Sequence, residues 1–328
     1  MLSPKCYITI GERLRFIGCN ELSVSRSVEN LSATGYISLS QLAMFDSKKR
    51  SVITVNKEVK AGDSVTIELG YLETDIKILF KGYIKAVNTS DKVKLDIEDS
   101  MFILRQKPII ISEKKIKLKN LLTKLLNGTE ITISKRTADV MIDVFQYNGN
   151  VAGALAVIKE KLNLTVYINY DNVLYAGLEA AEMLDENEQK AARIQLTYGR
   201  NIVENNVNYQ TKESNPVKII VKGKAPDGKE TIAEAGMDGG SKQTYYKYNV
   251  TDKKSLQAIA EQYYNRQSFD GFSGTITIMG LTPAITGGTV EYKNDNYKDN
   301  EGRYFIKAVQ TTFGNDGIKQ KLTMGYKL

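Results

Sequence analysis

The chain carries one short strand pattern twice, as Tyr83-Ile84-Lys85-Ala86-Val87-Asn88 and as Phe305-Ile306-Lys307-Ala308-Val309-Gln310. Each copy follows a glycine turn that leads into a strand, at Gly62-Asp63-Ser64-Val65-Thr66 and at Gly287-Gly288-Thr289-Val290-Glu291. Each copy also precedes a closing strand. Alternating strands resemble one another for physical reasons, so coincidence is the competing explanation. The shared order of turn, strand and strand favours an internal duplication.

The residues around the first copy alternate between apolar and polar, as strands with one buried face do. The predicted strands are Val52–Val55, Val65–Leu69, Ile76–Phe80, Tyr83–Val87 and Val93–Ile97. Turn residues such as Ala61-Gly62-Asp63 separate them. A meander of this length can close into a small barrel. We therefore predict a first antiparallel β-barrel over residues 1–104.

Helical spacing replaces the alternation after Pro108 and ends at Asn127-Gly128. The predicted elements are a helix with apolar residues from Ile116 to Leu126, a strand over Glu130–Ser134, a helix capped by Asn150, and a hairpin of Leu164–Tyr170 with Val173–Gly177. Glu179–Ala192 is predicted to be a short helix or linker. Residues 105–193 are therefore predicted to form an inserted mixed α/β domain.

Strand alternation returns at Ile194 and continues, with one interruption, to the C-terminus. The predicted strands include Ile194–Tyr198, Ile202–Val203, Asn206–Tyr209, Val217–Val221 and Gly274–Ile278. The interruption is a glycine-rich polar segment followed by a helix that Thr251 is predicted to cap. We predict a second β-barrel over 194–222 and 268–328, with a loop-helix insertion over 223–267.

The predicted fold class is therefore mainly β with α+β insertions. It comprises two similar antiparallel β-barrel domains, a small mixed α/β domain and a helix-containing insertion. The length of 328 residues agrees with more than one domain, because single hydrophobic cores rarely grow this large.

The composition excludes several classes of enzyme. The chain has no histidine, so a Ser-His-Asp triad, a Cys-His pair and a HExxH zinc site are impossible. Cys6 and Cys19 are too few for a disulfide framework or a cysteine-only zinc site, and we predict both to be buried small hydrophobes. We predict no enzyme activity, no catalytic residues, no cofactor and no metal, and binding residues stay unassigned.

Apolar residues make up 42% of the chain, but no apolar run approaches 18 residues. We therefore expect no membrane insertion, and the polar start leaves no signal-peptide core. We expect the chain to be made and folded in a cytoplasm. The net charge of +7 raises the possibility of nucleic-acid binding, and Arg105–Lys119 is the densest basic stretch. This stretch leads into a predicted amphipathic helix and carries no recognition motif, so we predict no specific nucleic-acid recognition.

Two motifs resemble enzyme signatures but lack essential parts. Gly223-Lys224-Ala225-Pro226-Asp227-Gly228-Lys229-Glu230 matches a phosphate-binding loop except at Glu230, where that loop needs Ser or Thr. We interpret Pro226-Asp227-Gly228 as a turn. Ser112-Glu113-Lys114-Lys115 has the Ser-x-x-Lys spacing, but its companion motifs are missing, so it is interpreted as a polar turn.

Two residue clusters leave binding or catalysis open. Asp96, Glu98 and Asp99 suggest a carboxylate pair for glycosidic cleavage, but on one strand Asp99 points away from the other two. We interpret them as a solvated strand end. Tyr245-Tyr246-Lys247-Tyr248 and Tyr263-Tyr264 could stack on sugars or bases, but packing within a sheet or an interface is the simpler interpretation.

The order of these elements resembles the baseplate hub proteins of contractile phage tails, the late control D family. Within it, the chain looks most like hubs of Firmicutes prophages and phage-tail-like bacteriocins. The resemblance spans nearly the whole chain and rests on Gly70-Tyr71, Ile78–Ile84, Asp99–Leu104, Tyr198-Gly199-Arg200-Asn201-Ile202-Val203, Phe269–Ile278, Gly302–Ile306 and Leu322–Leu328. Each motif consists of strand and turn residues, so the specificity lies in their order.

This resemblance implies a homotrimeric ring that joins a sixfold tail tube to a threefold spike. The implied partners are two further copies, the tube or a tube initiator, the central spike, other baseplate proteins and the tape measure protein. The particle would assemble in the bacterial host cytoplasm and be released as part of the tail. Two alternatives are a tail-associated peptidoglycan hydrolase and a glycan-binding tail protein.

Overall fold

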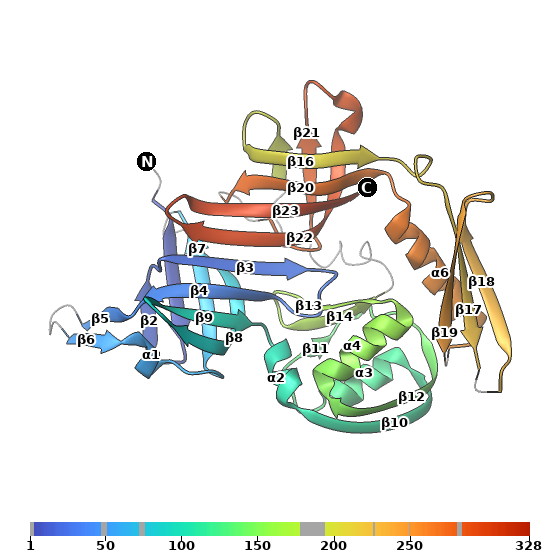
Figure 1. Cartoon of the computed structure of the whole chain (residues 1–328), viewed down its shortest axis with the longest axis horizontal. Coiled ribbons are helices and arrows are strands. Elements are labelled where there is room, and N and C mark those ends of the chain that lie inside the picture. Colours follow the sequence, from blue (N-terminus) through green and yellow to red (C-terminus); the bar gives the residue numbers. More distant parts are fainter. Residues whose placement is uncertain are drawn as a thin grey trace.

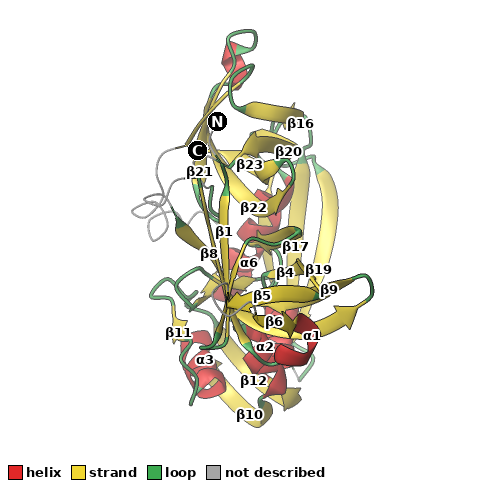
Figure 2. Ribbon diagram, turned by 90° about the vertical axis from the view of Figure 1, so that its left-hand side faces the viewer, coloured by secondary structure: helices red, strands yellow, loops and turns green. Residues whose placement is uncertain are grey.

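The computed structural model describes residues 3–46, 51–71, 76–177, 194–225, 227–248, 250–280 and 284–328. Strands form most of it, and helices are few (Figure 1). The predicted class, mainly β with α+β insertions, is confirmed. Figure 2 shows that helices α2 and α3 lie toward the end of the molecule opposite strand β16.

The N-terminal region is a curled antiparallel sheet around its own apolar core. Its strands are β1 (Lys5–Ile10), β2 (Leu14–Ile17), β3 (Glu21–Ser27), β4 (Thr34–Ser40), β7 (Ser64–Gly70), β8 (Lys77–Thr89) and β9 (Lys92–Glu98). A hairpin of β5 (Leu42–Asp46) and β6 (Ser51–Thr54) projects from it and leads into α1 (Val55–Glu58). Every second residue points inward, and Ile8, Ile67 and Leu95 are fully buried in the core.

Two details of this region differ from the sequence prediction. The strand predicted over Val52–Val55 ends at Thr54, because Val55 already begins α1. The strands predicted over Ile76–Phe80 and Tyr83–Val87 are one continuous strand, β8. Gly82 lies inside that strand, where a Cβ would come 2.3 Å from the carbonyl oxygen of Glu98. Gly82 therefore does not form a turn between two strands. It allows β8 and β9 to approach each other closely.

The mixed α/β unit follows the first region. Its elements are α2 (Met101–Gln106), β10 (Pro108–Lys117), α3 (Leu118–Leu126), β11 (Thr132–Ile133), β12 (Met141–Asn150), α4 (Val151–Leu162), β13 (Thr165–Ile168) and β14 (Val173–Gly177). The side chain of Asn150 accepts a hydrogen bond from the Gly153 N–H at 2.8 Å, as predicted for the cap of α4. Ile116, predicted to be helical, lies in β10, and the strand predicted over Glu130–Ser134 shortens to β11. Glu179–Ala192 lies outside the described residues.

The C-terminal region is a second curled sheet. Its elements are β15 (Ile194–Thr197), β16 (Ile202–Gln210), β20 (Gly271–Met279), β21 (Thr289–Lys293), the short 3-10 helix η3 (Lys298–Asn300), β22 (Gly302–Gly314) and β23 (Gly317–Lys327). Its core contains Phe272, Tyr292 and Tyr304, whose rings pack against one another. Ring pairs of this kind add to the burial of their large apolar area.

The insertion into the second region is a sheet covered by a helix. Its elements are β17 (Val217–Lys224), β18 (Glu230–Gly236), β19 (Ser241–Tyr248) and α6 (Lys253–Gln267). The sequence prediction assigned Val217–Val221 to the second barrel, but among the described strands β17 pairs only with β18 and β19. The glycine-rich segment predicted as a loop contains β18. The insertion and the α/β unit share one apolar core, because α4 packs against β19.

The cap of α6 also differs from the prediction by one residue. Asp252, not Thr251, caps the helix, and its carboxylate accepts hydrogen bonds from the N–H and hydroxyl of Ser255. Thr251 instead donates from its N–H and its hydroxyl to Asp143 in β12. Thr251 therefore ties the start of the helix to the α/β unit.

The duplication predicted from the sequence reappears in the strand order of the two curled sheets. In the first region the order is β1-β7-β8-β9-β4-β3, and in the second it is β15-β21-β22-β23-β20-β16. Every neighbouring pair is antiparallel in both, except that β15 runs parallel to β21. The two orders match strand for strand.

The match extends to single residues. In both regions the Ile-Lys-Ala-Val strand is irregular at its lysine, between Ile84 and Ala86 and between Ile306 and Ala308. The N–H of Ile84 donates to Asp63, and that of Ile306 donates to Gly288. The N–H groups of Gly62 and Gly287 donate in turn to the carbonyl oxygens of the same two isoleucines. The φ angles of these glycines are 95° and 80°. Both turns therefore require the left-handed backbone that glycine adopts without strain.

A second pair of glycines shows which of the remaining strands of the two sheets are equivalent. Gly35 in β4 lies opposite Val24 in β3, and Gly274 in β20 lies opposite Val207 in β16. A Cβ on Gly35 would come 2.3 Å from the carbonyl oxygen of Ser23, and one on Gly274 would come 2.1 Å from that of Asn206. The pairings therefore make β3 equivalent to β16, with Val24 matching Val207.

Candidate assembly interface

The two curled sheets are joined edge to edge by the pairing of β22 with β3 (Figure 1). The register runs from Ala308 opposite Ser27 to Phe313 opposite Leu22. Val309 and Thr311 of β22 and Val24 and Arg26 of β3 are buried along it. Because this joint continues the hydrogen-bond ladder from one region to the other, the chain contains a complete example of how two such modules pair.

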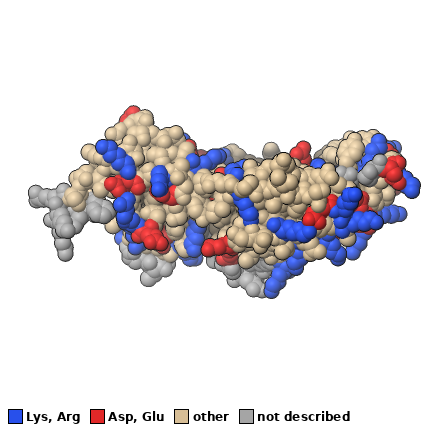
Figure 3. Space-filling model, turned by 90° about the horizontal axis from the view of Figure 1, so that it is seen from below, with Lys and Arg blue, Asp and Glu red and all other residues tan. Residues whose placement is uncertain are grey.

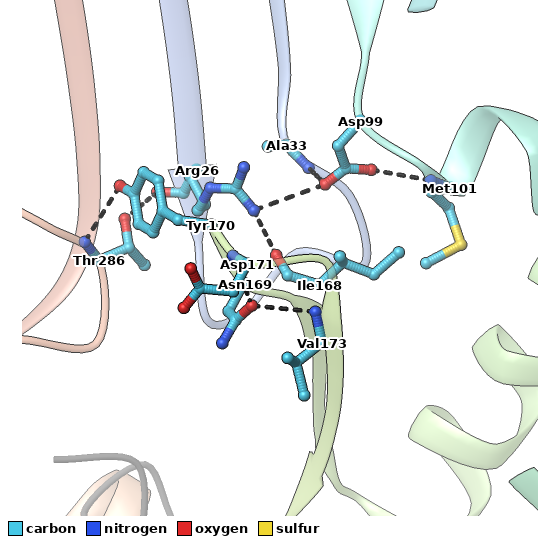
Figure 4. Close-up of polar contacts among 10 residues, drawn as sticks. All are labelled: Arg26, Ala33, Asp99, Met101, Ile168, Asn169, Tyr170, Asp171, Val173 and Thr286. Atoms are coloured by element: carbon cyan, nitrogen blue, oxygen red, sulfur yellow. Dashed lines mark hydrogen bonds and ion pairs between the residues drawn. The ribbon is translucent and has the colours of Figure 1, made fainter. Parts of the chain in front are cut away.

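Arg26 lies near one end of this joint, opposite Val309, and is 5% exposed (Figure 4). Its Nη1 lies 3.7 Å from Oδ2 of Asp99 and donates a hydrogen bond to the carbonyl oxygen of Ile168. Its guanidinium lies over the ring of Tyr170, with Cζ 4.4 Å from the ring centroid. Guanidinium groups suit such sites because they stack on rings and donate in a fixed plane.

The same junction also reaches the second region. The backbone oxygen of Arg26 accepts a hydrogen bond from the hydroxyl of Thr286 at 3.0 Å, and the Thr286 N–H donates to the hydroxyl of Tyr170 at 3.4 Å. Figure 4 shows residues from three parts of the chain around the side chain of Arg26. Arg26 therefore links the first region, the α/β unit and the second region.

Asp99 is a charged partner of this buried cation, and it is itself 2% exposed. Its two carboxylate oxygens accept hydrogen bonds from the N–H groups of Ala33 and Met101 at 2.7 and 3.0 Å. Burial raises the pKa of Asp99, while Arg26 and the two N–H groups oppose that rise. The carboxylate would be costly to bury without its cation.

The structure corrects the interpretation of Asp96, Glu98 and Asp99 as a solvated strand end. Glu98 is fully buried, and its Oε1 accepts a hydrogen bond from Nε of Arg105 at 2.8 Å. Of the three, only Asp96 is partly exposed, and the side chain of Asn88 in β8 donates a hydrogen bond to its carboxylate. The carboxylates thus serve structural ion pairs. One signal for Arg26 was available in the sequence, because it continues the inward-facing series of Leu22 and Val24.

The tyrosine-rich stretch is divided between two faces of β19. Tyr245 stacks on Tyr263 of α6 with ring centroids 3.8 Å apart, whereas Tyr246 and Tyr248 point away from the helix and are exposed. Lys247, on the helix side, is 6% exposed, and its Nζ donates to the carbonyl oxygen of Glu160 at 3.2 Å. Burial lowers the pKa of Lys247 to about 8, and the nearby Arg266 adds to this effect.

Replacement of Lys247 by Met is expected to reduce the pH dependence of stability. The pKa of this lysine is about 8 in the folded chain, against its ordinary value of 10.5 in an unfolded chain, so the unfolded state binds more protons between these pH values. This lysine alone therefore makes stability rise with pH in this window, by about 2 kcal/mol from pH 7.5 to 9.5. Burial also lowers the pKa of Lys159 to about 8, so urea unfolding at both pH values should show a rise that is about 2 kcal/mol smaller in Lys247→Met and not abolished. Lys242→Met, at an exposed position of the same strand, should keep the full rise.

The two enzyme-like motifs occupy hairpin and strand positions. Gly223 and Lys224 end β17 and Glu230 begins β18, and Lys224 pairs with Glu230 at 3.3 Å. Pro226 of the predicted turn lies outside the described residues. Ser112 lies exposed on β10 and accepts a hydrogen bond from Gln146. The lysines of the basic stretch are also mostly exposed on β10, and Figure 3 shows basic and acidic side chains interspersed over the face seen from below.

The remaining candidates for chemistry are few. Cys6 is buried and Cys19 half-buried, with their sulfur atoms 4.0 Å apart, so the prediction of two buried thiols holds fully only for Cys6. Their hydrogen bond and burial raise the pKa of the Cys6 thiol. Within the described ranges, no three Cys, Asp or Glu side chains gather as a metal site. The same residues include no helix that is long and apolar enough to cross a membrane.

This fold of two matched β-sheets, joined at an edge and carrying α/β insertions, is similar to the fold of solved tail proteins. The tail protein of Neisseria meningitidis MC58 aligns over 98% of this chain and 96% of its own, with a TM-score of 0.69 and 12% identity. The 43 kDa tail protein of prophage MuSo2 from Shewanella oneidensis aligns over 99% and 97%, with a TM-score of 0.64 and 10% identity.

A third similar structure is the E. coli c3393 protein, a type VI secretion system component described as structurally similar to the T4 tail proteins gp27 and gp5. It aligns over 98% of this chain and 79% of its own, with a TM-score of 0.57 and 9% identity. No protein-family model and no curated protein matches the chain in sequence. At these identities the likeness establishes the fold.

Proposed function

We propose that the chain is a non-enzymatic structural hub of a contractile tail or tail-like injection particle. In this role three copies form a ring that joins a sixfold tail tube to a threefold spike. The observation that carries the proposal is the duplication, because each chain presents two modules with the same strand order. Three copies then present six similar modules to the tube while keeping threefold symmetry toward the spike. The tail-protein fold supports the same role.

An exposed apolar surface on the first region supports contact with a further partner. Ile17 of β2 and Leu42, Met44 and Val52 of the β5–β6 hairpin are all more than half exposed. Three of them, Ile17, Leu42 and Met44, line one shallow depression. Large exposed apolar surfaces mark interaction sites in folded proteins. We assign this surface to another tail component, of which the tube or its initiator is the first candidate.

The proposal places the chain in the baseplate of a particle that assembles in the bacterial cytoplasm and is then released. Its further partners are the spike, other baseplate proteins and the tape measure protein. Catalysis and glycan binding, if the particle needs them, would belong to other chains.

Electron microscopy of purified tail particles that contain the chain tests this role. We expect a ring on the tail axis between tube and spike, with threefold symmetry and six similar lobes around a lumen. Particles in which the chain lies away from the axis as separate monomers would overturn the proposal. A tag on the exposed loop between β17 and β18 identifies the chain in the images, because this hairpin lies far from the joint of the two sheets (Figure 1).

A further inference from the structure

A cavity of about 270 Å³ lies where α6, the second curled sheet and the α/β unit meet. Residues of α6, β22 and β23 form much of its wall, together with Thr165 of β13 and the turn after β3. This volume is many times what one ordered water requires. Arg26 and Asp99 do not line it, so the cavity is separate from the junction described above.

The charged side chains around this cavity are mostly cationic. Its lining residues include four cations and two carboxylates, namely Lys212, Arg266, Lys307 and Lys327 with Glu29 and Asp270. None of these four cations forms an ion pair with a carboxylate of the described ranges. The cavity therefore attracts anions.

Arg266 is oriented by the α/β unit and keeps donors for a ligand. Its Nη1 donates to the side-chain oxygen of Asn163 at 3.1 Å, and its Nη2 donates to the hydroxyl of Thr165 at 2.9 Å. A guanidinium group has five N–H donors, so these two bonds leave others unused. Fixed guanidinium groups of this kind suit carboxylates, which accept in the same plane.

Lys307 of β22 supplies a second, partly desolvated cation. Its Nζ lies 4.6 Å from the centroid of the Phe269 ring. Burial lowers the pKa of Lys307; the nearby Arg266 adds to this effect, and Glu29 opposes it. An anion in the cavity would stabilise both cations, because charges interact strongly where water is partly excluded.

Gln262 of α6 gives an independent indication of a ligand. Its side chain lines the cavity and is 1% exposed. Neither its amide nitrogen nor its amide oxygen has a hydrogen-bond partner within the part of the chain that the structure describes. Buried polar groups without partners are costly, so a ligand that brings both a donor and an acceptor would relieve this cost.

We infer that the cavity binds the carboxyl end of a partner protein chain. The terminal carboxylate would lie between Lys307 and Arg266. An apolar last side chain would pack against the rings of Phe269 and Phe305, which line the same cavity. The peptide group before the last residue would supply the donor and the acceptor that Gln262 lacks.

A chain end fits this cavity better than an acidic side chain within a segment. A small cavity admits one end of a chain, whereas an internal segment needs space both to enter and to leave. One terminal residue also carries the carboxylate, the apolar group and the peptide group together. The site belongs to the single chain, and only the assignment of its occupant to another tail component rests on the proposed hub role.

The duplication supplies a comparison within the same chain. Lys85 of β8 occupies the position of Lys307, at the same irregularity of the repeated strand. Lys85 is exposed and does not line the cavity. The lysine is therefore common to both modules, whereas the cavity forms only beside the module that carries the α6 insertion.

Fluorescence anisotropy of the purified full chain tests the site with three labelled pentapeptides. The first ends in phenylalanine with a free carboxyl group, and the second has the same sequence with an amidated end. Amidation removes the charge and keeps the shape, so we expect it to weaken binding by about tenfold or more. The third is amidated and has aspartate before the phenylalanine. It should bind as weakly as the second.

Three variants locate the binding on the chain. Lys307→Met should weaken binding of the first peptide by about tenfold without lowering the urea midpoint, because it removes a partly desolvated charge. Lys85→Met is the matched control and should keep the affinity within about twofold. Gln262→Leu should raise the urea midpoint and yet weaken binding by about fivefold, because two unpaired buried atoms are lost. A residue with only a structural role would not show these opposite changes.

The possible contrary results are distinct. No binding of the first peptide at about 1 mM, or equal binding of the first and second, would overturn the site. Equal losses for Lys307→Met and Lys85→Met would show general attraction to a chain of net charge +7. Tight binding of the third peptide would overturn the assignment to a chain end.

These results also separate the site from the hub role. Binding is measured on single chains, so its failure leaves intact a threefold ring seen by electron microscopy. Particles without that ring would remove the hub role and with it the assignment of the occupant to a tail component. Binding of the first peptide would then still establish the site.

Discussion

Replacement of Arg26 by Met is expected to destabilise the chain by about 3–5 kcal/mol, the cost of breaking a buried ion pair by removing one partner. The variant leaves Asp99 buried without its cation and the carbonyl oxygen of Ile168 without that donor. Urea unfolding at pH 7.5, followed by circular dichroism, measures the loss. Because Arg26 touches three parts of the chain, we expect their unfolding to become less cooperative.

The pH dependence of this loss and a double variant identify its cause. Burial raises the pKa of Asp99, so the folded state gains a proton more readily than the unfolded state as the pH falls. The penalty of Arg26→Met should therefore be smaller at pH 5 than at pH 7.5. The double variant Arg26→Met with Asp99→Asn should recover much of the loss.

An exposed ion pair provides the matched control. Lys117 and Asp139 lie 3.1 Å apart with both side chains more than half exposed, so Lys117→Met should cost less than about 1 kcal/mol. A loss for Arg26→Met no larger than this would show that the buried pair does not hold the junction together.

Replacement of Gly274 by Ala is expected to cost about 2–4 kcal/mol, because the new methyl group would meet the backbone of the neighbouring strand. The Cβ would lie 2.1 Å from the carbonyl oxygen of Asn206, which cannot move away without breaking the β16–β20 pairing. The φ of 118° at Gly274 adds strain for any other residue. Hydrogen exchange should show faster exchange of the β16 amides.

The duplication makes this prediction testable twice. Gly35→Ala should have an effect of similar size, expressed in β3, because its Cβ would lie 2.3 Å from the carbonyl oxygen of Ser23. Gly314→Ala is the control, since no atom outside its neighbours lies closer than 3.8 Å to its Cβ. It should change stability by less than about 1 kcal/mol. Equal effects at Gly274 and Gly314 would contradict the packing argument.

Several elements could be predicted because their signals are local. The cap at Asn150, the end of α3 at Asn127-Gly128 and the hairpin around Asp171-Asn172 depend on residues close together in the chain. The alternation in β7 and β9 likewise shows which side chains face inward. The duplicated Ile-Lys-Ala-Val strand was found from its sequence context alone.

Other features depended on which distant segments meet. Val217–Val221 alternates like a barrel strand, yet β17 joins a separate sheet because β18 and β19 pair with its two edges. Alternation identifies a strand but not its neighbour. The carboxylate of Asp99 looked solvated for a similar reason, because its partner Arg26 lies in β3, far away in the sequence.

The sequence by itself determined that this protein is built mainly of strands, that two of its regions are copies, and that histidine-based chemistry is absent. Only the tertiary structure decided that the copies join through β22 and β3, and that Arg26 and Asp99 form a buried ion pair beside this joint. Side-chain alternation is written into each strand, whereas edge pairing and buried charge depend on the register between segments far apart in the chain.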